Sequence, residues 1–133
     1  MQTWHEETIR SSAFGPLLTA AQSYFASAPR KKAAFHQCLA LCTAQGEQVI
    51  CPIAADTIEF LNAQARRVAL DLTKSGKTVA KIVCVWENGG LDMPARAFLQ
   101  ALCDAGAENK PAEILLRADG TAYAVRTIAD AIG

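Results

Sequence analysis

The residue best suited to nucleophilic chemistry in this sequence is Cys51, which ends a short segment at residues 47–51 that becomes apolar at Val49. That segment predicts a strand, and a helix is predicted to begin soon after it, capped by Asp56. The positive end of a helix lowers the pKa of a nearby thiol, so a cysteine between a strand and a helix is a candidate nucleophile. Asp56 brings negative charge to the same place, and no second cysteine follows closely enough to resolve a disulfide. We therefore favour a packed Cys51 and keep a thiol-dependent redox or transfer enzyme as the alternative.

Cys38 and Cys42 are the best candidates for metal ligands, because a spacing of four puts both thiols on one face of a helix. A structural zinc site needs four ligands. The other cysteines and the two histidines, His5 and His36, show no paired spacing that would complete such a site. Neither histidine is placed for a Ser/His/Asp triad. The sequence predicts no metal and no other cofactor.

The loop at residues 86–92 follows a predicted central strand, and ligands of open α/β sheets bind at the carboxyl ends of strands. Glu87 and Asp92 would suit a cation or a basic partner, and Gly89 and Gly90 leave backbone amides accessible. A plain connection between strand and helix is the favoured interpretation, with Asp92 as the helix cap. Should the chain bind a partner protein, the residues that we predict to contact it are Glu87, Asn88, Asp92 and, in the aromatic N-terminal part, Trp4.

One apparent phosphate-binding motif is rejected. Residues 75–78 read Ser-Gly-Lys-Thr, but a P-loop also needs a glycine five positions before Gly76, where Asp71 stands. The predicted order here is helix, loop, strand, the reverse of the order in a P-loop.

The composition is that of an ordinary single globular domain: 133 residues, of which 51% are hydrophobic and 20% charged. Thirteen basic residues balance thirteen acidic ones, so the basic excess of a nucleic-acid-binding protein is absent. Apolar runs are too short to span a membrane, the N-terminus lacks the pattern of a signal peptide, and the five cysteines are odd in number. We expect a cytoplasmic protein that binds neither nucleic acid nor membrane, and we leave a homo-oligomer open.

The elements must then place these residues. We expect an α/β fold, with α+β left open, in which three N-terminal helices precede the order β-α-β-α-β-β and a mixed sheet of about four strands. The helical part is predicted at 1–46, the α/β core at 47–128 and a tail at 129–133. The predicted helices are 2–13, 15–28, 30–45, 56–74 and 93–103, and the predicted strands are 47–51, 78–86, 112–118 and 121–128.

The last two strands are predicted to form a hairpin around Asp119-Gly120, a favoured two-residue turn. This turn fixes a register in which apolar residues face each other and one pair is oppositely charged. The predicted pairs are Ile114 with Val125, Leu116 with Tyr123, and Glu113 with Arg126. The three strands before the last are predicted to be parallel neighbours, with the last strand antiparallel.

Over residues 47–128 this order resembles the thioredoxin-like core, and Pro111 precedes a strand where that family carries a cis-proline. The resemblance implies a redox or transfer enzyme with Cys51 as nucleophile. The C-x-x-C motif of that family is absent, because Cys51-Pro52-Ile53-Ala54 keeps only one cysteine.

Recognisable catalytic motifs are otherwise missing, so the leading functional prediction is a protein-binding module without catalytic activity, of an adaptor, inhibitor or immunity type. The first alternative is the thiol enzyme described above. The second is a small-molecule sensor that binds near Gly89 and Gly90.

Overall fold

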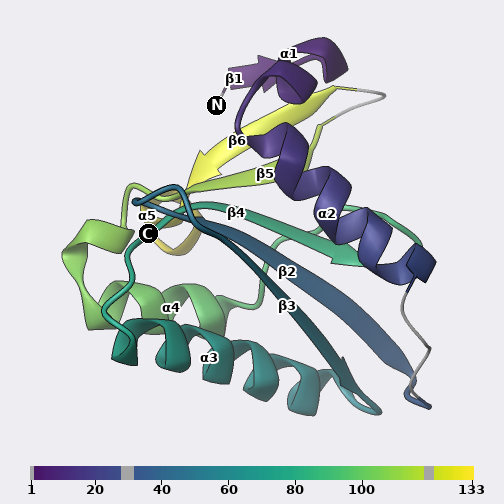
Figure 1. Cartoon of the computed structure of the whole chain (residues 1–133). Helices are drawn as coiled ribbons and strands as arrows, with labels where there is room; N and C mark the ends of the chain where they lie inside the picture. The colour runs from purple at the N-terminus through teal and green to yellow at the C-terminus, as the bar shows by residue number, and fades with distance from the viewer. Residues whose placement is uncertain (1, 28–31, 119–121) are drawn as a thin grey trace.

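A six-stranded mixed sheet organises the part of the chain that the computed structural model describes, residues 2–27, 32–118 and 122–133. Figure 1 shows helices on both faces of this sheet. Across the sheet the strands follow the order β1 (Gln2–Trp4), β6 (Tyr123–Thr127), β5 (Glu113–Arg117), β4 (Val79–Trp86), β2 (Phe35–Thr43) and β3 (Gln48–Ala55). The helices are α1 (Glu6–Ser11), α2 (Phe14–Ser27), α3 (Ile58–Lys74), α4 (Arg96–Ala105), the 3₁₀ turn η1 (Ala107–Asn109) and α5 (Ile128–Ile132). The predicted α/β class is confirmed.

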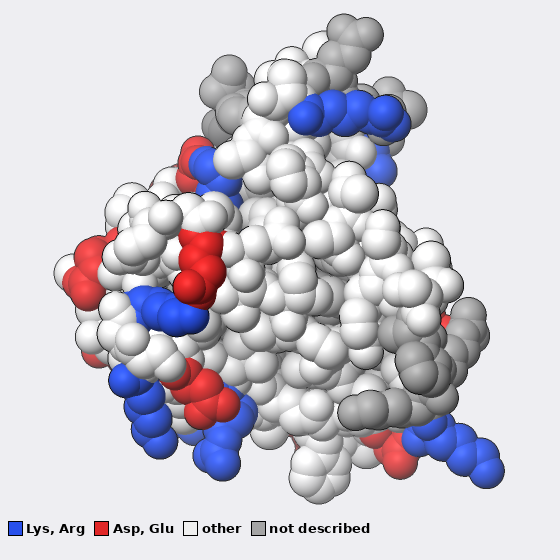
Figure 2. Space-filling view, viewed as in Figure 1, with Lys and Arg blue, Asp and Glu red and all other residues white. Residues whose placement is uncertain are grey.

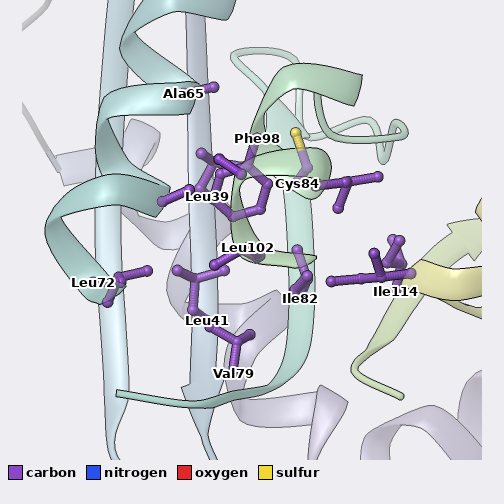
Figure 3. Packing of buried hydrophobic residues seen from close by; sticks show 14 of the residues in the cluster. Leu39, Leu41, Ala65, Leu72, Val79, Ile82, Cys84, Phe98, Leu102 and Ile114 are labelled. Atoms are coloured by element: carbon purple, nitrogen blue, oxygen red, sulfur yellow. The ribbon is translucent and has the colours of Figure 1, made fainter. Parts of the chain in front are cut away.

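Each face of the sheet has its own apolar core. On one face α2 packs over β2 and β4, with α1 packed against α2, around Phe14, Leu17 and Val83. On the other face α3 and α4 lie side by side and bury the larger cluster, shown in Figure 3, around Leu39, Phe98 and other side chains. A sheet covered on both faces needs apolar residues at nearly every position of its central strands, and β4 satisfies this requirement.

The predicted helix at 30–45 is wrong: its described part contains β2, the strand between β3 and β4. Alternate residues of β2 serve different cores, with Cys38 facing α2 and Leu39 facing α3. A strand buried on both faces reads as a continuous apolar run, which periodicity alone does not distinguish from a helix. The insertion of β2 also corrects the sheet order. β3 and β4 are not neighbours, and of the predicted parallel contacts only that between β4 and β5 forms.

β3 lies at the edge of the sheet and continues past Pro52, where the sequence predicts an end. An edge strand tolerates proline because the missing N–H can face away from the neighbouring strand. Ala54, two residues after Pro52, is bound through its backbone by the side chain of Gln64 from α3. Gln64 donates to the carbonyl oxygen of Ala54 at 2.6 Å and accepts from its N–H at 3.2 Å. Both features reduce the capacity of this edge to pair with another strand.

The helix after β3 begins one residue later than predicted. Thr57 Oγ1 caps α3 by accepting from the N–H of Phe60 at 3.2 Å, whereas the predicted cap, Asp56, accepts from the N–H of Ala34. Ile58, the first residue of the predicted apolar face, is 44% exposed. Leu61, Ala65 and Leu72 of that face are buried as predicted, and Val68 is partly buried.

The predicted hairpin forms, but its register is shifted by one residue. Leu115 pairs with Val125, and Ile114 pairs with Arg126. The apolar match could not select the register, because β5 is buried on both faces. Glu113 instead accepts from Lys81 of β4 at 2.6 Å. The predicted turn residues Asp119-Gly120 lie outside the described residues.

At the two ends of the chain, β1 and the short helix α1 replace the predicted helix at 2–13, and α5 occupies most of the predicted tail. Within the described residues, no helix is both long and apolar enough to cross a membrane. On the face shown in Figure 2, the lysines and arginines drawn in blue lie in separate groups toward the margins.

Candidate functional site

The carboxyl ends of β3 and β4 lie at the same end of the sheet, and the helices α3 and α4 follow them on the same face. This arrangement arises because each of the two strands is antiparallel to β2, which lies between them. Ligands of α/β sheets bind at such ends, where the connections into the helices leave room. The side chains at this end are therefore the candidate site.

Two aromatic side chains meet there. Phe35 begins β2 and Trp86 ends β4, and their ring centroids are 6.5 Å apart with an angle of 58° between the planes. Trp86 pairs with Gln37, so Phe35, two residues earlier in β2, projects from the same face of the sheet. Both rings are partly buried against the core under α3 and α4, which leaves part of each exposed.

Asp92 fixes the edge of this aromatic pair. Its Oδ2 accepts a 2.8 Å hydrogen bond from Nε1 of Trp86, and its Oδ1 accepts one of 2.7 Å from the N–H of Met93. The Asp92 N–H donates to the carbonyl oxygen of Cys84. A carboxylate has about four lone-pair positions, so this exposed group retains capacity to accept from a ligand. Asp92 is thus not the predicted helix cap; α4 begins at Arg96, with Ala95 at the N-cap position.

The other loop residues turn toward different partners. The N–H of Glu87 donates to the carbonyl oxygen of His36, and Asn88 Oδ1 accepts from the N–H of Gly90. The left-handed conformation of Gly89, with φ of +84°, closes the turn, and Gln22 of α2 donates to its carbonyl oxygen.

Of the predicted partner-contacting residues, Glu87, Asn88 and Asp92 share this loop. Trp4 does not join them, because it lies on β1, which β6 and β5 separate from β4. Sequence reasoning missed Phe35, since it was placed within a predicted helix.

Cys51 is not an activated nucleophile. It lies within β3, partly buried beside a small cavity of about 200 Å³ that Asp71 also lines. Burial raises the pKa of this thiol, and the negative charge of Asp71 raises it further, the opposite of what a thiolate needs. Pro111 is not cis, since the described residues contain no cis peptide bond, and β4 and β2 separate its neighbouring strand β5 from β3. The thiol-enzyme alternative is wrong.

Comparison with solved structures identifies the fold. A variant of the cytidine deaminase from Mycobacterium tuberculosis superposes with a TM-score of 0.62 and 18% identity, covering 91% of this chain and 92% of that one. The cytidine deaminase from Mycobacterium leprae gives a TM-score of 0.59 and 18% identity, covering 92% and 98% of the two chains. No family model and no curated protein sequence matches the chain. At this identity the likeness shows the fold alone.

These likenesses overturn two expectations from the sequence. The solved structures named above, whose fold this chain shares, are cytidine deaminases, and this finding contradicts the predicted non-catalytic protein-binding module of adaptor, inhibitor or immunity type. The resemblance to the thioredoxin-like core is replaced by a fold that matches over nine-tenths of the chain.

Zinc deaminases carry the pattern H-x-E followed by P-C-x-x-C, in which histidine and cysteines bind the metal. The residues of this chain do not fit that ion. Proline precedes none of the five cysteines, and α3 contains neither histidine nor cysteine. Among the described residues, no group of three or more His, Cys, Asp or Glu side chains could hold a metal ion.

Proposed function

We propose that this chain binds a cytidine-class pyrimidine nucleoside at the aromatic site formed by Phe35, Trp86 and Asp92. The observation that carries the proposal is the position of this site: two aromatic rings and an oriented carboxylate at the carboxyl end of a central strand, in a fold shared with cytidine deaminases. This geometry favours binding of a pyrimidine nucleoside. Whether the bound nucleoside is also converted is measured in the same samples.

The two rings provide the apolar part of the recognition. Stacking of a base on an aromatic side chain contributes about 1–3 kcal/mol of binding free energy, whichever base it is. Phe35 and Trp86 keep exposed surface while their buried parts hold them in place, so little side-chain entropy would be lost on binding.

Asp92 provides the selectivity. Cytosine presents an exocyclic amino group, a donor, where uracil presents a carbonyl oxygen, an acceptor. A carboxylate accepts a hydrogen bond from the amino group of cytosine and repels the carbonyl oxygen of uracil. Because the hydrogen bonds from Trp86 and Met93 fix its orientation, Asp92 would favour cytidine over uridine.

The test is a calorimetric titration of the purified protein with cytidine and with uridine, followed by chromatography of the same samples for conversion of one into the other. We expect saturable cytidine binding that is weakened about 10- to 100-fold by Asp92→Asn, the loss expected for a hydrogen bond to a charged group. Phe35→Leu should weaken binding of both nucleosides by about tenfold.

The matched control is Phe25→Leu, which changes an aromatic residue packed on the opposite face of the sheet. It should leave the affinity for cytidine unchanged. Absence of cytidine binding, or cytidine binding that Asp92→Asn leaves intact, would remove this proposal.

The same proposal includes a reducing compartment such as the cytoplasm. All five cysteines are unpaired, as expected where thiols stay reduced.

A further inference from the structure

We infer that this chain is a zinc-independent form of the deaminase fold. Phe98, an apolar core residue, stands where zinc deaminases have a metal-binding cysteine. The inference rests on the fold and on the identity of the residues, and it does not depend on the proposed nucleoside site.

The helix α4 shows the replacement most directly. Residues 94–98 read Pro-Ala-Arg-Ala-Phe, the spacing of P-C-x-x-C with Ala95 and Phe98 at the two cysteine positions. Pro94 supplies the proline of the pattern and is buried just before the N-cap residue of α4, Ala95. Neither alanine nor phenylalanine offers an atom that could bind zinc.

The space around Phe98 is packed rather than hollow. Phe98 is 0% exposed and belongs to the largest fully buried side chains of the described chain. Figure 3 shows its ring among Leu39, Ala65 and Cys84, which contribute from β2, α3 and β4. A zinc ion would therefore need both new ligands and the removal of this ring.

Cys84 lies beside Phe98 in this cluster (Figure 3), and it is poorly suited to a metal. Zinc requires the thiolate form. Burial raises the pKa of the fully buried Cys84 thiol strongly, and the charge of Asp92 raises it further. The helix α3, which packs beside α4, also has no histidine or cysteine that could serve as a further ligand.

The consequence concerns chemistry. Zinc deaminases use the metal to activate the water that attacks the base. The described residues of this chain do not provide the ligands for such a zinc-bound water, so the chain lacks the water activation that zinc deaminases use.

The experiment uses tag-free protein expressed in zinc-supplemented medium. Metal content is measured by plasma mass spectrometry after gel filtration, and the melting temperature is recorded with and without 1,10-phenanthroline. Cobalt(II) is then added, and the visible absorption bands of a tetrahedral thiolate site are sought. We expect far less than one zinc per chain, an unchanged melting temperature and no such bands.

Stoichiometric zinc that survives gel filtration, or a melting temperature that falls with the chelator, would overturn the inference. A matched pair of variants adds a second readout: Phe98→Leu and Leu99→Ile both exchange one buried apolar side chain of α4 for another, and neither should change the metal content. Stoichiometric zinc in Phe98→Leu but not in Leu99→Ile would contradict the inference, because the residues left in place would then suffice to bind the metal. Nucleoside binding is measured in a separate experiment. If the chain bound no cytidine, the inference about zinc would still hold, and if the chain bound zinc, the proposed nucleoside site would still be open to its own test.

Discussion

Nε1 of Trp86 donates a 2.8 Å hydrogen bond to Oδ2 of Asp92, across the loop that joins β4 to α4. This bond ties the last residue of a central strand to the carboxylate that would read the base. Asp92 does not cap α4, because that helix begins at Arg96, and its Oδ1 accepts from the N–H of Met93 instead. The indole orientation and the carboxylate orientation are therefore set together, which is the kind of support that a selective binding site requires.

The first prediction separates the fold of this loop from its binding role. Asp92→Asn keeps an oxygen that can accept from Trp86, whereas Asp92→Ala removes both acceptors. We expect Asp92→Ala to lower the free energy of unfolding by about 1 kcal/mol, the usual net contribution of such hydrogen bonds at an exposed site. Asp92→Asn should lower it by less. Urea titration followed by circular dichroism measures both. Equal, large losses in the two variants would show that the charge, and not the hydrogen bond, holds the loop.

The second prediction tests Phe98 as a core residue. Phe98→Ala should lower the free energy of unfolding by about 3–5 kcal/mol, because it removes a fully buried ring and leaves a cavity. Phe98→Leu, which conserves most of the volume, should cost less than about 1.5 kcal/mol. The exposed Phe60, at 68%, supplies the control, and Phe60→Ala should change stability little. Similar losses at the two phenylalanines would contradict the packing.

The sequence predicted some elements correctly because a single force dominates them. In α3 the apolar residues Leu61, Ala65 and Leu72 recur at helical spacing, and the opposite side is solvated, so only a helix fits. The strand β4 is apolar and β-branched over most of its length, which a strand accommodates better than a helix does.

The errors came from residues that serve two faces or a distant partner. Cys38 and Cys42 share one side of a helix at a spacing of four, but they also share one side of a strand, and only the neighbouring strands β3 and β4 decide between them. Asp92 has the sequence context of a cap, and its true partner, Trp86, becomes visible only once the loop is folded. Phe35 was missing from the candidate site because it begins β2, the strand that was predicted as a helix.

The third prediction concerns Gln64, whose side chain makes two hydrogen bonds to the backbone of Ala54 on the edge strand β3. Gln64→Ala should lower the free energy of unfolding by about 1–2 kcal/mol and expose the backbone groups of the edge. Light scattering at increasing protein concentration should therefore show more self-association than in the wild type. The control is Gln100→Ala, because the Gln100 side chain donates to the exposed Asp104 on its own helix. Equal behaviour of the two variants would deny Gln64 a protective role.

The fourth prediction concerns Asn109, which is 2% exposed and joins two elements of the core. Its Oδ1 accepts from the N–H of Val79 at the start of β4, and its Nδ2 donates to the carbonyl oxygen of Leu102 in α4, each at 2.9 Å. Asn109→Ala leaves both buried groups unsatisfied and should cost about 2–4 kcal/mol of stability. Asn88→Ala, which loses one hydrogen bond at an exposed turn, should cost less than about 1 kcal/mol. A loss at Asn109 no greater than that at Asn88 would mean that water replaces its partners.

The last prediction is a pH dependence set by Cys38. Burial raises the pKa of this thiol to about 11 in the folded chain, with a smaller contribution from Cys51, whereas an unfolded cysteine titrates near 9. Between these two values the unfolded chain loses the thiol proton while the folded chain keeps it. The unfolded state gains from ionisation in that window, so the free energy of unfolding falls as pH rises, by up to about 1.4 kcal/mol per pH unit for one thiol. Below pH 9 the contribution is fully present and constant.

Urea titrations at several pH values from 8 to 11 measure this slope. Lysines and tyrosines ionise over the same range, so the informative quantity is the difference between the wild type and Cys38→Ala, in which only the thiol is removed. We expect the variant to be less stable at pH 8, because a buried side chain is shortened, and to lose less stability on going to pH 11. The gap between the two proteins should therefore narrow as pH rises. Parallel curves would mean that Cys38 ionises as readily in the folded chain as in the unfolded one, and hence that water reaches it through the α2 face of the sheet.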